Sequence, residues 1–557
     1  MAHSSAAADQ NMVRSCDVVV VGAGVGGLYT LFRLRQLGFT VQVLEQGGDV
    51  GGTWYWNKYP GCRCDVESYQ YSYSFSEELQ REWTWSERFA PQPEILSYLQ
   101  HVADRFDLRR DIAFNTTVSA ANWDEARQEW KIETEDGNTW VAPYCIMATG
   151  SLSVPRTSVL PSQDAFAGEI YYTATWPADG VDVTGKRVGI VGTSASGTQS
   201  IPHLAAQASH LTVFQRTANF SIPSRNAPMN PATDAEWKAN YTQLRKEQWQ
   251  QRAAIIFETP TRSALEVDAE ELERELERRW EAGGLGFLRA FTDLFSDHEA
   301  NGLAADFVRR KIGETVRNPE VAGKLMPTDH PIGSRRICTD NGYYETFNRD
   351  NVTLVDVRST PIEEVLPGGV RTSDAVYPLD VLVLATGFDA VIGALCRIDI
   401  RGRDGALLRD KWVNGPVAHM GLAVAGYPNL FYQTGPLSTG TLASMIQGNE
   451  LQTDWLATLL VHARENGITE IEATEEAAID WTIKCDELAK SLVHYYAPES
   501  SYIFKAPDGS RKFMIYTGGF DGYRQELEAC AKAGYSGFVM QKGVHAGISA
   551  AAQAVGA

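Results

Sequence analysis

The sequence is poor in the residues that would build a disulfide framework, a metal site or a membrane span. Its 557 residues contain eight cysteines and ten histidines, scattered without a C-x-x-C or an H-x-x-x-H pair. Such scattering argues against a disulfide framework and a structural metal. The longest apolar segment, 18–31, is interrupted by four glycines and is too short to cross a bilayer. We therefore expect a cytoplasmic protein that contains no metal and does not bind a membrane.

Basic residues are scarce relative to acidic ones. Lys and Arg total 50 against 70 Asp and Glu, which gives a formal net charge of -20 at pH 7. Binding to nucleic acid or to an anionic membrane requires a basic surface, so this balance argues against both. The first thirteen residues lack the basic start and apolar stretch of a secretory signal. We expect a disordered tail there and another after about residue 541.

A dinucleotide-binding fingerprint lies near the start of the chain. The apolar run 17–21 leads into a G-x-G-x-x-G motif made by Gly22, Gly24 and Gly27, and leucines at helical spacing follow. In such a strand–turn–helix unit the glycines allow a tight turn, a close approach to a pyrophosphate and close packing of helix on strand. The next apolar run ends in Glu45, whose carboxylate suits both hydroxyls of an unphosphorylated ribose. This site predicts FAD or NAD rather than NADP.

A second, weaker fingerprint follows the apolar run 186–191. Its loop runs from Gly192 to Gly197, with Ser194 in place of the middle glycine. The next predicted strand ends in Arg216, at the place where the first site has an acid. A guanidinium matches a 2′-phosphate bidentately, whereas an acid repels it. Taken alone, Arg216 would be a solvated cation at a strand end; its place after a phosphate loop favours NADPH here and FAD in the first site.

The order of these signals predicts the domain organisation. Two strand ends, 147–150 and 384–387, each lead into a small-residue turn, as expected where the chain crosses between domains. Between them the composition becomes charged and alanine-rich, which is typical of helices. We predict an α/β fold with two Rossmann-like dinucleotide-binding domains and an inserted helical lobe. The predicted boundaries are 1–150 and 386–557 for FAD, 151–225 and 326–385 for NADPH, and 226–325 for the helical insertion.

Further motifs resemble those of Baeyer–Villiger monooxygenases, FAD-dependent enzymes that insert oxygen beside a ketone carbonyl. The segment 51–65 (GGTWYWNKYPGCRCD) is similar to the family's flavin-contacting pattern, and the segments 333–336, 342–351 and 427–431 also fit. Two positions depart from the family. Tyr172 stands where the linker motif has histidine, and Tyr502 where relatives often carry a tryptophan that covers the nicotinamide.

The resemblance implies the chemistry. NADPH and O2 would oxidise cyclic or bulky ketones to esters or lactones through a C4a-peroxyflavin, in a monomer or weak homo-oligomer. Arg336 would keep the peroxide anionic and Asp65 would orient Arg336. The expected FAD-binding residues are Gly22, Gly24, Gly27, Glu45, Thr53, Trp54, Asp65, Tyr71 and Met445. The expected NADP-binding residues are Arg63, Gly192, Thr193, Ser194, Gly197, Gln199, Arg216, Thr217, Arg335, Arg336 and Tyr502.

Three other functions fit the same two fingerprints. An N- or S-oxygenating flavin monooxygenase needs no arginine of this kind, and a disulfide reductase needs a C-x-x-C, which the sequence does not contain. A non-catalytic FAD-binding redox sensor is the third. Without the surrounding motifs, Asp65 and Arg336 would be interpreted as an ordinary interdomain salt bridge.

Three local expectations concern segments around the predicted site. We expect Trp54 and Tyr71 to line the flavin, and Trp56, Tyr59 and Tyr69 to fill core. The segment 270–280 predicts a solvated helix face with the pairs Glu270–Arg274 and Glu275–Arg279. The segment 497–514, rich in Ser, Lys and Pro, predicts a mobile loop over the active site.

Overall fold

The computed structural model describes residues 13–157, 159–497, 500 and 502–543, so the tails predicted at both ends lie almost wholly outside the described residues. A five-stranded parallel sheet contains the first fingerprint. Its order is β20 (Leu430–Tyr432), β8 (Tyr144–Met147), β2 (Val18–Val21), β3 (Val41–Leu44) and β4 (Ile112–Ala113). Strand β2 is a run of four valines buried on both faces, as the centre of a parallel sheet requires. Helix α1 (Val25–Gln36) follows β2 and packs against α13 (Met445–Asn466).

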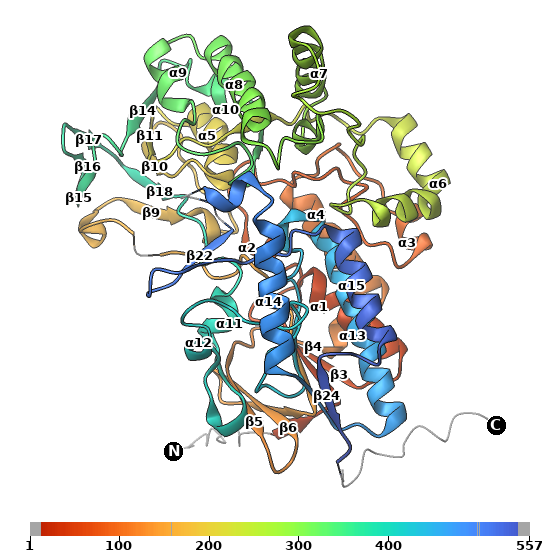
Figure 1. Cartoon of the computed structure of the whole chain (residues 1–557). Coiled ribbons are helices and arrows are strands. Elements are labelled where there is room, and N and C mark those ends of the chain that lie inside the picture. Colours follow the sequence, from red (N-terminus) through yellow and green to blue (C-terminus); the bar gives the residue numbers. More distant parts are fainter. Residues whose placement is uncertain (1–12, 158, 498–499, 501, 544–557) are drawn as a thin grey trace, which may run out of the picture.

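A second five-stranded parallel sheet contains the second fingerprint and lies in the upper part of Figure 1. Its order is β14 (Val352–Asp356), β11 (His210–Gln215), β10 (Arg187–Val191), β18 (Val381–Leu384) and β9 (Glu169–Tyr172). Helix α5 (Ala195–Gln207) follows β10 and packs against it and against α10 (Tyr343–Thr346). The fold is therefore α/β with two nucleotide-type units, as predicted.

Strand pairing shows how the chain returns to the first unit. Another five-stranded sheet has the order β1 (Val13–Ser15), β7 (Thr139–Ala142), β6 (Glu129–Thr134), β5 (Val118–Asp124) and β19 (Asp399–Arg401). A strand that follows the second parallel sheet in sequence thus pairs with one that precedes it. A three-stranded antiparallel sheet extends from the second unit: β15 (Ile362–Leu366), β16 (Gly369–Thr372) and β17 (Val376–Pro378).

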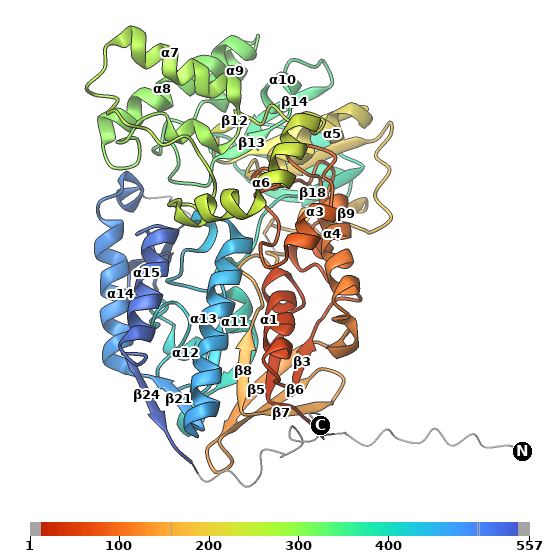
Figure 2. The same ribbon diagram turned by 90° about the vertical axis from the view of Figure 1, so that its right-hand side faces the viewer.

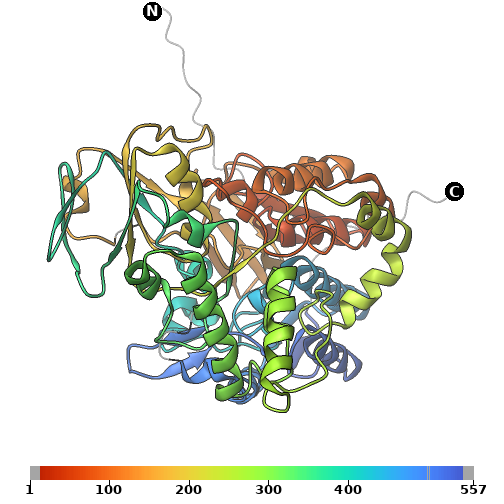
Figure 3. The same ribbon diagram turned by 90° about the horizontal axis from the view of Figure 1, so that it is seen from above.

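The predicted insertion is helical. Its helices are α6 (Pro231–Gln250), α7 (Ala269–Ala282), α8 (His298–Thr315) and α9 (Pro319–Leu325), and an Asn or Asp side chain caps the N-terminus of each. The strands that flank the insertion, β12 (Ser221–Pro223) and β13 (Cys338–Asp340), pair in parallel, so the chain leaves and re-enters at neighbouring positions. Figure 3, the view from above, shows these yellow-green to green helices nearest the viewer.

The C-terminal part packs beside the first sheet. Figure 2 shows α13, α14 (Glu475–Ala489) and α15 (Phe520–Lys532) below the insertion with their axes roughly aligned. Strand β24 (Phe538–Gln541) pairs with β21 (Glu470–Ala473). The other α-helices of the described residues are α2 (Thr53–Trp56), α3 (Glu77–Glu82), α4 (Gln92–Arg105), α11 (Gly393–Arg397) and α12 (Leu408–Lys411).

The structure bears on two of the local expectations. Within 497–514, the described residues include a hairpin of β22 (Ile503–Lys505) and β23 (Arg511–Phe513), with Phe513 and Met514 buried, and the mobility of this segment stays a prediction. Trp56 is 37% exposed and does not fill core.

In the insertion, only part of the prediction for 270–280 is correct. The predicted pair Glu275–Arg279 forms at 2.8 Å, but the Arg279 side chain is buried against the lobe instead of solvated. Among the described residues Arg274 pairs with Glu271, at 3.7 Å, instead of Glu270.

Within the described ranges, no helix is long and apolar enough to cross a membrane. No group of three or more His, Cys, Asp or Glu side chains in those ranges has the geometry to hold a metal ion. All eight cysteines are free thiols.

Candidate active site

The loop after β2 brings backbone close to backbone in a way that only glycine permits. Gly22 has φ +105°, and a Cβ there would lie 2.6 Å from the carbonyl oxygen of Ala148. A Cβ on Gly27 would lie 1.8 Å from the oxygen of Gly22, and one on Gly24 would lie 3.3 Å from Cα of Gly52. These contacts leave the first turn of α1 open to a phosphate without an intervening side chain.

Glu45 follows β3 beside this loop and is buried. Its carboxylate accepts hydrogen bonds from the backbone N–H groups of Ala23, at 2.6 Å, and Gly47, at 2.7 Å. Burial raises the pKa of Glu45, and the two N–H groups partly oppose that shift. An acceptor fixed at this strand end fits the adenosine ribose of FAD, and the glycine cradle fits its pyrophosphate.

The loop after β10 repeats the same contacts. Gly192 has φ +109°, and a Cβ there would lie 2.5 Å from the carbonyl oxygen of Ala385, while a Cβ on Gly197 would lie 2.2 Å from the oxygen of Gly192. Ala385 thus occupies in the second unit the place that Ala148 occupies in the first. The two Ala-Thr-Gly turns therefore cover their glycine loops as well as mark chain crossings.

Arg216 follows β11 and is exposed, with no ion pair to any described residue. The neighbouring Thr217 accepts hydrogen bonds from Thr193 Oγ1, at 3.1 Å to its carbonyl oxygen, and from Arg358, at 3.0 Å to its hydroxyl. Arg358 also pairs with Asp329 at 2.6 Å. Sequence reasoning missed Arg358, although it follows β14, the strand next to β11. This strand edge gathers cations that fit a 2′-phosphate.

Asp65 and Arg336 are far apart in the sequence, and their side chains form an ion pair. Arg336 donates from Nε and Nη2 to the two carboxylate oxygens of Asp65, at 2.8 Å each, and the side chains are 36% and 23% exposed. Burial lowers the pKa of Arg336, but the charge and hydrogen bonds of Asp65 outweigh it and raise that pKa above its usual value. The guanidinium is therefore a permanent cation with a fixed orientation.

Two tyrosines, Tyr71 and Tyr502, lie near this pair, and Trp54 contacts the first of them. Trp54 Nε1 donates to the hydroxyl of Tyr71 at 3.2 Å, and their rings meet edge to face at 5.8 Å. Burial raises the pKa of Tyr71 and of Tyr502, and the charges of Asp65 and Arg336 act on both hydroxyls. The structure thus brings Asp65, Arg336, Tyr71 and Tyr502 close enough for their charges and hydroxyls to interact.

Arg63 and Gln199 meet at the start of α5. Arg63 pairs with Glu87 at 2.8 Å, and its carbonyl accepts from Gln199 at 3.2 Å. The hydroxyl of Tyr59 donates to Oε1 of Gln199 at 2.9 Å.

Other predicted residues have no described contact with Arg336. Ser194 caps α5 without a side-chain hydrogen bond, Thr53 is exposed at the start of α2, and Met445 is partly buried at the start of α13. Tyr172 uses its hydroxyl within the linker, where Gln163 donates to it at 2.6 Å and it donates to the carbonyl of Thr157.

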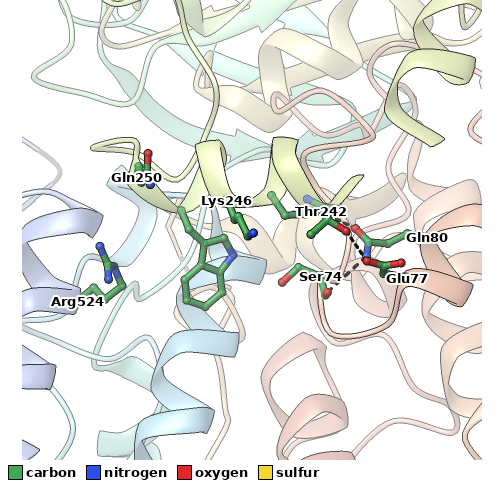
Figure 4. A pocket seen from close by; sticks show the side chains of 9 residues that line it. Ser74, Glu77, Gln80, Thr242, Lys246, Gln250 and Arg524 are labelled. Carbon is green, nitrogen blue, oxygen red and sulfur yellow. Dashed lines mark hydrogen bonds between the residues drawn. The ribbon is translucent and has the colours of Figure 1, made fainter. Parts of the chain in front are cut away.

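A cavity of about 410 Å³ lies elsewhere, between α3, α6 and α15. Figure 4 shows Thr242, Gln80, Glu77 and Ser74 on one side of it and Arg524 and Gln250 on the other. Its most buried cation, Arg245, donates to Gln80, Gln248 and Ser72 at 2.6–2.8 Å. These bonds occupy the guanidinium inside the fold, so the cavity does not carry the chemistry of Arg336.

Comparisons with known proteins place these features in context. The family described as Pyridine nucleotide-disulphide oxidoreductase matches residues 19–274. The chain is 41% identical over 535 residues to 2-oxo-Delta(3)-4,5,5-trimethylcyclopentenylacetyl-CoA monooxygenase of Pseudomonas putida, covering 94% of this chain and 98% of the relative. It is 40% identical to a Baeyer-Villiger monooxygenase of Pseudooceanicola batsensis, with coverage of 94% and 96%. It is also 41% identical to phenazine N-monooxygenase PhzNO1 of Lysobacter antibioticus, with coverage of 94% and 97%.

Solved structures agree over most of the chain. A steroid monooxygenase bound to NADP superposes with a TM-score of 0.91 at 48% identity, covering 95% of this chain and 100% of the other. OTEMO in complex with FAD and NADP superposes with a TM-score of 0.92 at 39% identity, with the same coverage.

Proposed function

Because the chain belongs to the Baeyer–Villiger monooxygenase family, we propose that it oxidises a cyclic or bulky ketone with FAD, NADPH and O2. One ketone, one O2, one NADPH and one proton are consumed, and an ester or lactone, water and NADP⁺ are formed. The observation that carries this proposal is the bidentate Asp65–Arg336 pair beside Tyr71 and Tyr502. When bound, FAD accepts the hydride of NADPH and activates O2.

Each cofactor would be bound at its own glycine loop. The glycine loop after β2 and the buried carboxylate of Glu45 would hold FAD, because that carboxylate accepts ribose hydroxyls and disfavours a phosphate. The loop after β10, with Arg216 and Thr217 at the next strand end, would hold NADPH. Arg335 precedes Arg336 and would add positive charge toward the 2′-phosphate.

Arg336 would stabilise the reacting oxygen atoms. Oxygen insertion beside a carbonyl needs a nucleophilic oxygen that carries negative charge and then places negative charge on the carbonyl oxygen. A permanent cation of fixed orientation lowers the energy of both anions without rearranging during the reaction. Asp65 would position this cation through two hydrogen bonds of 2.8 Å. Tyr71 and Tyr502 would limit the access of water.

Arg336→Ala tests the proposal. We expect NADPH still to reduce bound FAD, while ester formation falls by at least about a hundredfold, as on removal of a main oxyanion-stabilising group. Arg187→Ala is the matched control, because Arg187 forms a similar bidentate pair with Asp380 at the start of β10, away from Gly192. Ester formation that survives in Arg336→Ala at the level of Arg187→Ala would contradict the proposal.

N-oxygenation is the second candidate, because one relative of equal identity is a phenazine N-monooxygenase. Attack by an amine or N-heterocycle on an activated oxygen needs no anionic nucleophile, so Arg336 would contribute less to it. Supplying ketones and phenazine-type heterocycles in parallel and identifying the products by mass spectrometry separates the two functions. A non-catalytic redox sensor would consume no NADPH in response to either class.

We also propose a cytoplasmic location and a monomer or weak homo-oligomer. Eight free thiols in a chain of this length support a reducing compartment.

A further inference from the structure

We infer that Asn301 and His494 are positioning residues for Arg336, acting through the peptide groups on either side of Ile332. This inference rests on the proposed function, because it assigns the two residues a role in the oxygen-insertion step. Neither residue touches the Asp65–Arg336 pair in any described contact. Both hold the short loop that leads from Ile332 to Arg336.

Asn301 binds Ile332 at two points. It lies in α8 of the insertion and is 2% exposed. Its Nδ2 donates to the carbonyl oxygen of Ile332 at 3.0 Å, and its Oδ1 accepts from the N–H of Ile332 at 3.1 Å. The same Nδ2 also donates to the carbonyl of Leu294 at 2.8 Å, which fixes the rotamer of the amide.

His494 binds the same carbonyl from the C-terminal part of the chain. Its Nε2 lies 3.2 Å from the oxygen of Ile332, and because a carbonyl only accepts, the ring nitrogen donates. Burial lowers the pKa of His494 to about 4, so the imidazole is neutral at neutral pH and has one N–H to give. The preceding residue, Val493, donates to the carbonyl of Phe295 at 2.9 Å, which anchors this segment to the insertion.

The loop therefore has little freedom to move. The N–H of Ile332 and both lone pairs of its oxygen are occupied, and its side chain is fully buried. Gly333 follows with φ +89°, and a Cβ there would lie 3.0 Å from Nε2 of His494. Ser334 closes the turn by donating from N–H and hydroxyl to the carbonyl of Pro331, at 3.2 and 2.8 Å. Beyond Arg336, strand β13 pairs with β12 and fixes the other side.

Such positioning matters because the guanidinium must meet a reacting atom, and a displacement of about 1 Å can lower a rate by about a hundredfold. A purely structural role is the alternative, since most buried polar groups form hydrogen bonds without taking part in catalysis. The two roles differ in their effect on coupling, which is the amount of ester formed per NADPH consumed. Loss of structure lowers cofactor content and every rate together, whereas loss of position diverts activated oxygen from ester to hydrogen peroxide.

The test compares His494→Phe with a matched control, His419→Phe. His419 is also buried, donates from Nε2 toward a backbone carbonyl, that of Ser536, at 3.1 Å, and faces a phenylalanine ring. It also lies beside a glycine with positive φ, Gly537. His494→Gln keeps a donor for the Ile332 carbonyl, and Asn301→Ala supplies a second variant if His494→Phe does not fold. The measurements on each holoenzyme are ester and hydrogen peroxide formed per NADPH, FAD content, and the rate of flavin reduction by NADPH.

We expect His494→Phe and Asn301→Ala to lower ester per NADPH by about tenfold or more, with hydrogen peroxide rising to balance, while FAD content and flavin reduction stay as in the wild type. His494→Gln should recover most of the ester, and His419→Phe should remain coupled. Equal coupling in His494→Phe, Asn301→Ala and His419→Phe would overturn the positioning role. Arg336→Ala, measured alongside, distinguishes a failure of this inference from a failure of the proposed function. If Arg336→Ala loses ester formation while His494→Phe and Asn301→Ala keep it, only this inference fails. If Arg336→Ala keeps ester, the proposed function fails as well.

Discussion

At the scale of single residues, two side chains at equivalent strand ends carry opposite charge. Glu45 follows β3 and is buried against two N–H groups, whereas Arg216 follows β11 and is exposed without an ion pair among the described residues. The first environment favours a neutral ribose edge and the second a phosphate. We propose that these two charges, one at each strand end, set the choice of cofactor.

Arg216→Ala should therefore weaken NADPH binding selectively. Loss of a charge-assisted contact of about 1.5–3 kcal/mol corresponds to an increase of about ten- to a hundredfold in KM for NADPH. The KM for NADH should change little, because NADH has no 2′-phosphate. Steady-state kinetics with both nucleotides measure the ratio. An equal loss with NADPH and NADH would mean that Arg216 does not bind the phosphate.

Glu450 predicts a pH dependence of stability. It is buried and accepts hydrogen bonds from the N–H and hydroxyl of Ser74, at 2.7 and 2.6 Å, and Ser74 lines the cavity of Figure 4. Burial raises its pKa to about 7, against the opposing effects of Ser74 and Arg245. The folded protein therefore keeps this proton at pH values where the unfolded chain has lost it, so stability falls as pH rises from the ordinary carboxyl pKa to about 7.

The Gln side chain of Glu450→Gln does not titrate, so the variant lacks this loss of stability. Its melting temperature should therefore rise relative to that of the wild type between about pH 5 and about pH 8, by the equivalent of about 2–3 kcal/mol in the free energy of unfolding. Thermal unfolding of both proteins across this range measures the difference. Glu77→Gln, at the exposed rim of the same cavity, is the control. Parallel curves for Glu450→Gln and the wild type would contradict the assignment of the buried proton.

Sequence reasoning reached the residues that repeat a known pattern and missed the exposed Arg358 and the buried Asn301 and His494. The two glycine loops and the residues Glu45 and Arg216 follow from strand–turn–helix spacing, and the pairing of Asp65 with Arg336 follows from family resemblance. Asn301 and His494 belong to no motif. Their common partner is a backbone peptide, and a hydrogen bond to a peptide group leaves no pattern in the side chains around it.

At the scale of elements, the glycine loops decide how close a helix can approach its strand. A Cβ on Gly27 would lie 1.8 Å from the oxygen of Gly22, a backbone atom that cannot yield without moving α1. The hairpin β22–β23 is an element that the composition of its segment did not indicate. Its strands are short and contain Lys and Arg, but Asp508-Gly509 between them is a hairpin turn signal, and Gly509 has φ +85°.

Gly27→Ala should lose FAD, because displacing α1 removes its N-terminus from the pyrophosphate. We expect the apparent dissociation constant for FAD to rise by at least about tenfold, equivalent to about 1.4 kcal/mol. Gly323→Ala is the control, since it adds the same methyl group to an exposed helical site with open space around it. Titration of apoprotein with FAD provides the measurement. FAD affinity equal in the two variants would refute the assigned loop.

At the scale of the whole molecule, chain topology brings distant segments to one site. Asp65 comes from the first unit, Arg336 follows the insertion, and Tyr502 lies in the C-terminal part. The pairing of β19 with β5 returns the chain to its first unit. The predicted boundaries at 150, 225, 325 and 385 remain predictions, since strand pairing describes the connections and not independent folding units.

The central claim is that this chain inserts one atom of O2 beside a ketone carbonyl at the expense of one NADPH. Incubation of the holoenzyme with NADPH, ¹⁸O2 and a cyclic ketone, followed by mass spectrometry, tests it most directly. We predict a lactone that carries one ¹⁸O atom and is formed with one NADPH consumed per lactone. NADPH consumption that responds to no ketone, or a lactone without ¹⁸O, would contradict the claim.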